Sequence, residues 1–439
     1  MGLRFGTNSF FLSGEIMNIK SIKNKIWQMP FIVISLIMLQ FYSDVVLAHG
    51  ERAQQAGIRM RTMYWWDVDV QPRKAKIGEL VTVTGKFMPS SFWPEHLASS
   101  EIASFMNIGV PGPAFLRMHS EVNGTPMVRS TRFYRGQEYH FKVVMKARQG
   151  GRYHVHPVVS VKDAGPIIAS GIWVEVEGKR PADFKNEVTT LMGDTIDLET
   201  YGMKEIIWMN TFWFIVGFAW LAYWFVRKDP VILTRYAYLA EHGEENGGKL
   251  ISMRDMIVSA LFFGFTLVAI AGGYFWAQAR FPNTTPLQTG KVVTNEIAPQ
   301  ADVLDVSVSN AVYHIPGRAF NFDVTVTNKG TSPLQVGEFA TAGIRFVNAK
   351  VLPGVKPTDE TDPVSPDGLI VDAPAVQPGE TKTFQVSAND ALWEKYRLTS
   401  LIYDPDSRFG GMLFFYDDQG NRYYHEIGAV MLPDFVDVK

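Results

Sequence analysis

The segment Ile206–Val226, IIWMNTFWFIVGFAWLAYWFV, determines how this chain is organised. It contains no charged residue, and a helix of this length, at about 1.5 Å per residue, covers the roughly 30 Å hydrocarbon core of a bilayer. A second uncharged segment, Met256–Ala277, ends in Tyr274 and Trp276. Aromatic residues at the ends of such segments are typical of the membrane interface rather than of a buried core helix. The sequence therefore predicts two transmembrane helices.

Basic residues predict the orientation of these two helices. The connection between them contains Arg227, Lys228, Arg235, Lys249 and Arg254, whereas the outer flanks contain few basic residues. Because Lys and Arg concentrate in cytoplasmic loops, the connection is predicted to be cytoplasmic. Both flanking regions then lie on the external or periplasmic side.

The N-terminal region has the pattern of a secretory signal peptide. A short apolar run at about Met29–Leu39 follows basic residues and is followed by Val46 and Ala48. A basic region, a short apolar region and small residues before a cleavage site define such a signal, and cleavage after Ala48 makes His49 the new N-terminus. An uncleaved N-terminal anchor is the alternative, and Met17 offers a second start position.

The two flanking regions are predicted to be β-sandwich domains. Period-2 or β-branched patterns bounded by Gly, Pro or Asp are typical of strands. Asp417–Asn421 has the composition of a hairpin turn, and Val351–Pro378, rich in Pro, Asp and Gly, is predicted to be a long loop. The predicted strands are Met60–Val70, Leu80–Met88, Glu138–Ala147, Gly151–Val161, Gly171–Glu177, Val303–Tyr313, Ala319–Asn328, Ile344–Asn348, Thr381–Val386, Met412–Tyr416 and Arg422–Ile427.

Composition excludes several classes of function. The chain has 439 residues with 42 Lys and Arg against 44 Asp and Glu, so its formal net charge of −2 gives no basis for binding nucleic acid. Cysteine is absent, which excludes disulfides, Cys-ligated zinc, iron–sulfur clusters, thiol nucleophiles and blue-copper centres. The sequence also contains no Gly-rich phosphate loop, G-x-S-x-G elbow or H-E-x-x-H motif.

Three of the nine histidines form a candidate metal site. His154 and His156 are two residues apart in a predicted strand, so both imidazoles are expected on one face. Signal cleavage would give His49 a free α-amine beside its imidazole, so these histidines together offer four nitrogen donors. Neutral nitrogen donors without thiolate favour copper first and zinc second.

The other candidate ligands have ordinary structural explanations. Methionine is a common core residue, although its thioether can bind Cu(I), and the acidic segment Asp359–Asp362 is interpreted as a solvated loop rather than a calcium site. The remaining histidines are interpreted as surface or hydrogen-bonded residues. The remaining histidines are His96, His119, His140, His242, His314 and His425. The methionines considered are Met60, Met63, Met88, Met118, Met127 and Met145.

A family resemblance covers essentially the whole mature chain. The chain closely resembles the B subunit of the copper membrane monooxygenases, which include particulate methane monooxygenase and ammonia monooxygenase. The motifs that carry it are His49–Gln54, Arg59–Thr62, Gly85–Phe87, Pro111–Pro113, His154–His156, Gly165–Ile167, Val188–Leu191, Pro316–Ala319, Gly337–Phe339 and Asp404–Phe409.

The resemblance implies an organisation that agrees with the patterns above. It implies two cupredoxin-like domains joined by a helical hairpin in the membrane, and assembly with the integral-membrane A and C subunits as a trimer of heterotrimers. The expected divisions are a signal peptide 1–48, a copper domain 49–180, a linker 181–205, helices 206–226 and 256–277, a cytoplasmic loop 227–255 and a C-terminal domain 278–439.

The resemblance also implies a copper site and an activity. The family's copper ligands in the B subunit match His49, His154 and His156. A second, bis-histidine site of some members falls on Tyr64 and Met88, so it is not expected here. Copper sites that include the C subunit perform or share the oxygen chemistry of this family.

The expected activity is O2-dependent hydroxylation of methane or ammonia in a bacterial inner or intracytoplasmic membrane. The alternative is a membrane-anchored periplasmic copper carrier or electron-transfer protein. Neither substrate is favoured, because Ile402–Phe409 looks more like methane-oxidising relatives whereas Lys162–Ile167 looks more like ammonia-oxidising ones.

Overall fold

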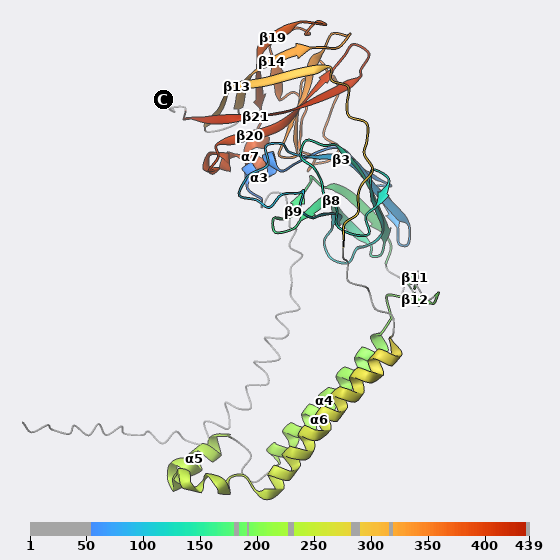
Figure 1. Cartoon of the computed structure of the whole chain (residues 1–439), viewed down its shortest axis with the longest axis vertical. Coiled ribbons are helices and arrows are strands. Elements are labelled where there is room, and N and C mark those ends of the chain that lie inside the picture. Colours follow the sequence, from blue (N-terminus) through green and yellow to red (C-terminus); the bar gives the residue numbers. More distant parts are fainter. Residues whose placement is uncertain are drawn as a thin grey trace, which may run out of the picture. The chain divides into compact units, whose positions relative to one another are not determined.

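The computed structural model describes residues 54–179, 184–190, 193–226, 232–281, 290–315 and 319–435. The predicted signal peptide, its cleavage site and His49 lie outside these residues. Strands dominate both regions that flank the two apolar helices (Figure 1). The prediction of a mainly β chain with two helices long enough to span a membrane is therefore confirmed.

The N-terminal region forms a sandwich of two sheets. In the first sheet, Val81, Val83 and Phe87 of β3 are fully buried, while Thr84 between them is exposed, so the strand has one core face. The first sheet has the order β1 (Met63–Gln71), β3 (Leu80–Pro89), β7 (Tyr139–Ala147), β5 (Phe115–Val122), β6 (Thr125–Pro126). The second has the order β2 (Lys74–Lys76), β10 (Ile172–Glu177), β8 (Gly151–Val161), β4 (Ser104–Gly109), with β9 (Gly165–Ile168) paired to β8.

The C-terminal region is one nine-stranded sheet. Its strand β21 pairs with β20 through Arg422–Val430 and then in parallel with β13 through Met431–Phe435, so one strand belongs to both halves. The order is β17 (Val364–Ser365), β16 (Ile344–Val347), β15 (Gln335–Thr341), β20 (Arg408–Tyr416), β21 (Arg422–Phe435), β13 (Leu304–Ile315), β14 (Ala319–Asn328), β19 (Thr381–Asn389), β18 (Leu369–Val371).

Aromatic side chains join the two halves of this sheet into a sandwich. The ring of Phe322 on β14 lies 5.3 Å from Phe339 on β15, and Phe320 lies 4.6 Å from Phe409 on β20. These strands are not neighbours in the sheet, so the rings fill the space between two layers. Offset or edge-on contacts of this kind stabilise a core beyond their buried area.

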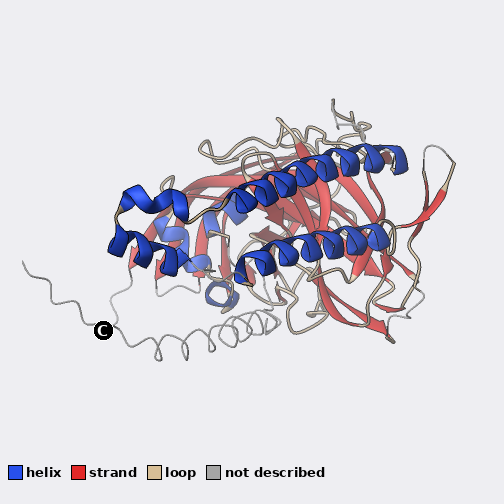
Figure 2. Ribbon diagram, turned by 90° about the horizontal axis from the view of Figure 1, so that it is seen from below, coloured by secondary structure: helices blue, strands red, loops and turns tan. Residues whose placement is uncertain are grey.

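Two long helices carry the apolar segments. Helix α4 (Met203–Phe225) and helix α6 (Met253–Arg280) have mean hydropathies of 1.5 and 2.1 and lie side by side (Figure 2). Trp220 stacks on Phe262 with ring centroids 4.4 Å apart. The hydroxyl of Tyr223 donates to buried Asp255 at 2.7 Å, and Asp255 also caps its own helix with Ser252.

The structure corrects four features of the strand and loop prediction. Predicted strand Met60–Val70 begins inside a short helix, α3 (Ala56–Arg61), and the predicted loop Val351–Pro378 contains β17 and β18. The sequence does not predict β4, β5 and β15, because Gly, Asn and charged residues interrupt their alternation. The connection between the membrane helices contains α5 (Ile232–His242) and a 3₁₀ helix, Glu244–Lys249. The remaining small elements are β11 (Glu187–Thr189), β12 (Thr195–Asp197), α7 (Leu392–Lys395) and the 3₁₀ helix Leu398–Tyr403.

Helix α3 joins the two sandwiches. Although it precedes the first N-terminal strand, its Ala56 and Met60 belong to the core of the C-terminal sandwich. The Arg59 guanidinium donates to the backbone carbonyls of Tyr396 at 2.8 Å and Ala342 at 2.7 Å. The segment that follows the predicted N-terminus is therefore held by the distant C-terminal domain.

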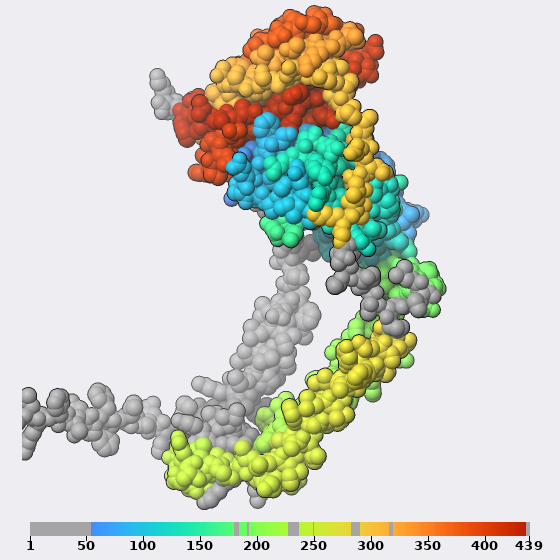
Figure 3. Space-filling model, in the orientation of Figure 1, coloured from blue at the N-terminus to red at the C-terminus, as the bar shows by residue number. Residues whose placement is uncertain are grey.

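The chain that leaves α6 makes a second connection. Its residues 290–303 run along the N-terminal sandwich, where the yellow and gold atoms cross the cyan surface in Figure 3. Thr131 donates to the carbonyl of Val292 at 2.7 Å, and Asn123 donates to that of Asn295 at 2.8 Å. The two sandwiches thus contact each other through several segments within one compact unit.

Candidate metal centre

Strand β8 carries the two predicted metal-binding histidines. It lies between β10 and β4, where His154 is opposite Trp173 and His156 is opposite Gly109. Alternation along the strand puts Val155 into the core and the two histidines on the other face, as the sequence predicts. Both imidazoles are nevertheless buried, with 6% and 7% of their residue surfaces exposed.

The two imidazoles form a compact pair. Their ring centroids lie 4.4 Å apart and their planes are nearly perpendicular, at 83°. Trp173 packs against His154 with centroids 4.6 Å apart, and the guanidinium of Arg152 lies 4.4 Å from the centre of the Trp173 ring. Trp173 on the neighbouring strand β10 therefore restricts the rotation of the His154 ring.

Hydrogen bonds assign the tautomer of each imidazole. Nδ1 of His156 lies 2.9 Å from the carbonyl oxygen of Ala169, which can only accept, so this nitrogen carries the hydrogen and Nε2 carries the lone pair. The Thr361 hydroxyl donates its one hydrogen to Asp359 at 2.8 Å and therefore accepts from His154 Nε2, 3.3 Å away. The lone pair of His154 is then on Nδ1.

Gly171 leaves room for the His156 ring. A Cβ atom on this residue would lie 2.6 Å from Cε1 of His156 and 2.8 Å from both ring nitrogens. Real Cβ atoms do not approach that closely, so a larger residue would displace the imidazole. The position therefore requires glycine for a reason of packing.

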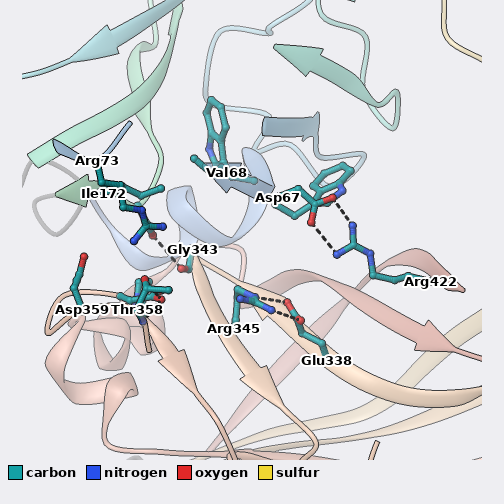
Figure 4. A pocket seen from close by; sticks show the side chains of 16 residues that line it. Asp67, Val68, Arg73, Ile172, Glu338, Gly343, Arg345, Thr358, Asp359 and Arg422 are labelled. Atoms are coloured by element: carbon teal, nitrogen blue, oxygen red, sulfur yellow. Dashed lines mark hydrogen bonds and ion pairs between the residues drawn. The ribbon is translucent and has the colours of Figure 1, made fainter. Parts of the chain in front are cut away.

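A cleft of about 210 Å³ lies beside the pair, between the sandwiches. Gly171 and residues of β1 and β10 line it on the N-terminal side, and residues of the C-terminal sandwich line it on the other. Figure 4 labels Asp67 and Ile172 from the first group and Glu338 and Asp359 from the second. In this cleft Arg345 pairs with Glu338 through contacts of 2.7 and 2.8 Å, and these hydrogen bonds raise the pKa of the Arg345 guanidinium. Arg422 of β21 also pairs with Asp67 of β1, and this pair alone of the two joins the C-terminal sandwich to the N-terminal one.

The histidine pair fits copper but does not complete a site. Two neutral imidazole nitrogens with defined lone pairs suit Cu(II) or Zn(II), and copper is the stronger binder of the two. Among the residues that the structure describes, no three His, Asp or Glu side chains gather around one point. The third predicted ligand, His49, lies outside those residues.

Tyr64 and Met88 lie in an apolar setting. They face each other in the register of β1 and β3 and are buried in a cluster with Trp66, Met412 and Phe414. Burial, followed by the charge of Glu426, raises the pKa of Tyr64 well above 10. The hydroxyl of Tyr64 forms a hydrogen bond with the hydroxyl of Ser90 at 2.9 Å.

Five other histidines have ordinary hydrogen-bond partners. The interpretation of these residues as surface or hydrogen-bonded histidines is confirmed, since each contacts a carboxylate or a backbone carbonyl. The pairs are His119 with Glu121, His140 with Glu138, His242 with the Tyr238 carbonyl, His314 with Asp434 and His425 with the Glu426 carbonyl.

Comparison with known families decides the class of this protein. Residues 50–435 match the family model that describes the monooxygenase B subunit. The chain belongs to the monooxygenase B-subunit family. Over 421 residues, 95% of this chain and 100% of the relative, this monooxygenase subunit is 40% identical to the particulate methane monooxygenase alpha subunit of Methylococcus capsulatus (strain Bath).

Two solved structures show weak similarity to this monooxygenase subunit. The cupredoxin domain of amoB from Nitrosocaldus yellowstonii is 14% identical and matches 29% of this chain and 97% of its own, with a TM-score of 0.23. A protein of unknown function from Porphyromonas gingivalis is 8% identical over 83% of this chain and 99% of its own, with a TM-score of 0.17.

The sequence does not reveal the histidine contacts made by the C-terminal domain. Thr361 is 207 residues from His154, and its neighbour Asp359 lies in a segment interpreted as a solvated loop. Acidic and hydroxyl residues are ordinary in loops, so no local pattern marks them. Only the strand alternation at His154 and His156 is recognisable in advance.

Proposed function

We propose that this chain is the copper-binding subunit of a membrane-bound monooxygenase complex that uses O2 to hydroxylate a small substrate. Its family membership and its two apolar helices support the membrane complex. The observation that carries the copper assignment is the buried pair of His154 and His156, whose tautomers are assigned by hydrogen bonds. The α-amine and imidazole of His49 are proposed to complete the site.

Copper bound at this site would supply one-electron and oxygen chemistry. The chain's own residues bind and orient the metal: His154 offers Nδ1 and His156 offers Nε2, while burial of both side chains limits contact with bulk water. Because a ligating histidine is oriented by the bond at its other nitrogen, both imidazoles are prepared for binding before metal arrives.

The first test is the N-terminus of the mature protein. Cleavage after Ala48 would give His49 the α-amine that the proposed site requires. Edman sequencing or intact-mass analysis of the native protein should therefore show a chain that begins at His49. A start at Met1, Met17 or any other residue would remove that amine from the site.

Methane is the substrate that the name of the 40% identical relative supports. Membranes that contain the native complex should convert methane to methanol with O2. Hydroxylamine formed from ammonia, without methanol from methane, would assign this chain to ammonia oxidation instead.

The A and C subunits are the proposed partners, in a trimer of heterotrimers with both sandwiches on the periplasmic side of the membrane. The native chain should co-migrate with two polytopic membrane proteins. A chain that migrates alone would favour a membrane-anchored copper carrier. Protease added to the periplasmic side of spheroplasts should cleave the sandwiches and spare residues 227–255.

A further inference from the structure

We propose that Thr361 of the C-terminal sandwich is a positioning residue for His154 of the N-terminal sandwich. This inference rests on the proposed copper-binding function and extends it. Its carrying observation is a hydrogen-bonded chain from Asp359 through Thr361 to His154, with distances of 2.8 and 3.3 Å. The copper site is therefore shared between two domains, although its two described imidazoles belong to one strand.

The Thr361 hydroxyl acts as a donor to Asp359 and as an acceptor from His154. Asp359 receives both the backbone N–H and the hydroxyl hydrogen of Thr361, each at 2.8 Å, and an ionised carboxylate only accepts. The hydroxyl oxygen then faces His154 as an acceptor. It keeps the hydrogen on Nε2 and directs the Nδ1 lone pair to the metal.

A second contact holds the Thr361 backbone. Buried Tyr396 donates its hydroxyl to the carbonyl of Thr361 at 2.7 Å. The backbone carbonyl of the same tyrosine accepts a hydrogen bond from Arg59 on α3. Arg59 is ten positions after His49 in the sequence. Tyr396 therefore links the loop that orients His154 to the helix that follows the proposed N-terminal ligand.

A purely structural role is the competing explanation, because Thr361 also stabilises its own loop. The same loop offers a matched control in Thr358, whose N–H and hydroxyl donate to Asp362 at 2.9 and 2.7 Å. Thr358→Val weakens the loop by one hydroxyl bond, as Thr361→Val does. Only the latter removes the acceptor that faces His154.

The experiment measures Cu(II) in the native complex carrying each variant of this chain. Copper affinity is determined by competition with a chelator, and the EPR spectrum is taken as the difference from a His154→Ala/His156→Ala complex that lacks this site. Thr361→Val should weaken copper binding about 10-fold or more, in the range known for second-layer ligand contacts, and should change the EPR parameters. Thr361→Ser keeps the hydroxyl, so its copper affinity and EPR parameters should match those of the wild type. Thr358→Val should also leave both quantities unchanged.

A further variant tests the position of the Thr361 hydroxyl without removing that hydroxyl. Tyr396→Phe removes the bond to the Thr361 carbonyl and keeps the carbonyl that receives Arg59, so it should weaken copper binding in the same direction but less than Thr361→Val. Wild-type affinity in Thr361→Val, or an equal loss in Thr358→Val, overturns the proposed role of Thr361 and leaves the copper function standing. If the wild-type spectrum minus the His154→Ala/His156→Ala spectrum contains no signal from histidine-bound copper, the copper function itself is wrong.

Discussion

Close contacts hold the His156 imidazole of the candidate site in place. The His156 ring occupies the space that a side chain at position 171 would need, and its Nδ1 is already committed to the Ala169 carbonyl. A binding site that must keep an imidazole within a few tenths of an ångström is sensitive to such neighbours. Packing at Gly171 therefore fixes the position of one imidazole of the candidate site.

Gly171→Ala is expected to lower copper affinity by about 10-fold or more, because the new methyl group would lie 2.6 Å from His156 Cε1. Gly109→Ala is the control on the other neighbouring strand, since its Cβ would lie 3.2 Å from Val158 and 3.8 Å from the His156 Cβ without meeting the ring. Chelator competition on both variants measures the effect. Equal affinities would contradict this explanation of Gly171.

Helix α3 shows how a short element can connect two domains. Its six residues could not form a stable helix alone, so the stability comes from burial of Ala56 and Met60 in the C-terminal core. Arg61 adds an ion pair with Asp404 at 3.1 Å and with Asp406 at 2.8 Å. Gly57 is required because a Cβ there would lie 1.6 Å from the Asp404 carboxylate.

Arg59→Met should destabilise the protein by about 2–4 kcal/mol, because the carbonyls of Tyr396 and Ala342 would lose a buried charged donor. Arg73→Met is the control, since Arg73 is partly exposed and pairs with Asp69 on the surface, where such pairs contribute little. Thermal unfolding of the purified complex measures both changes. The same loss for both variants would show that α3 is not anchored through Arg59.

Local sequence pattern predicts the strands better than the connections between domains. The period of two is visible at β3 and β8 because each strand has one core face. The prediction of a strand from Met60 is wrong at its start, because the helix at Ala56–Arg61 depends on contacts with residues nearly 300 positions away. The helix propensity of six residues contains no information about such distant contacts.

At the scale of the whole molecule, charged and hydrogen-bonded pairs hold the sandwiches together. The hydroxyl of Tyr424 on β21 donates to Glu138, which immediately precedes β7, and Lys86 lies 3.3 Å from the same carboxylate. Burial raises the pKa of Glu138, but the bonds from Tyr424 and His140 and the charge of Lys86 together lower it below its usual value. The ionised form is therefore the one that stabilises the folded contact.

This lowered pKa predicts how stability depends on pH. The contribution of Glu138 is complete above the unfolded pKa of about 4.3 and is lost as pH falls through the lower folded value. Glu138→Gln should lower the unfolding temperature at pH 7, and its difference from wild type should shrink below about pH 4. Exposed Glu175, paired with Lys74, provides the control Glu175→Gln, which should change little at either pH. A constant difference across this range would contradict the assignment.

This monooxygenase subunit is proposed to hold copper through His154 and His156. The most direct measurement is the copper content and EPR spectrum of the native complex carrying His154→Ala/His156→Ala, compared with the wild-type complex. The complex carrying the double variant should still assemble, but it should lose the copper assigned to this chain and the nitrogen-ligated copper signal. Full copper occupancy at this site in the double variant would show that other residues are the ligands.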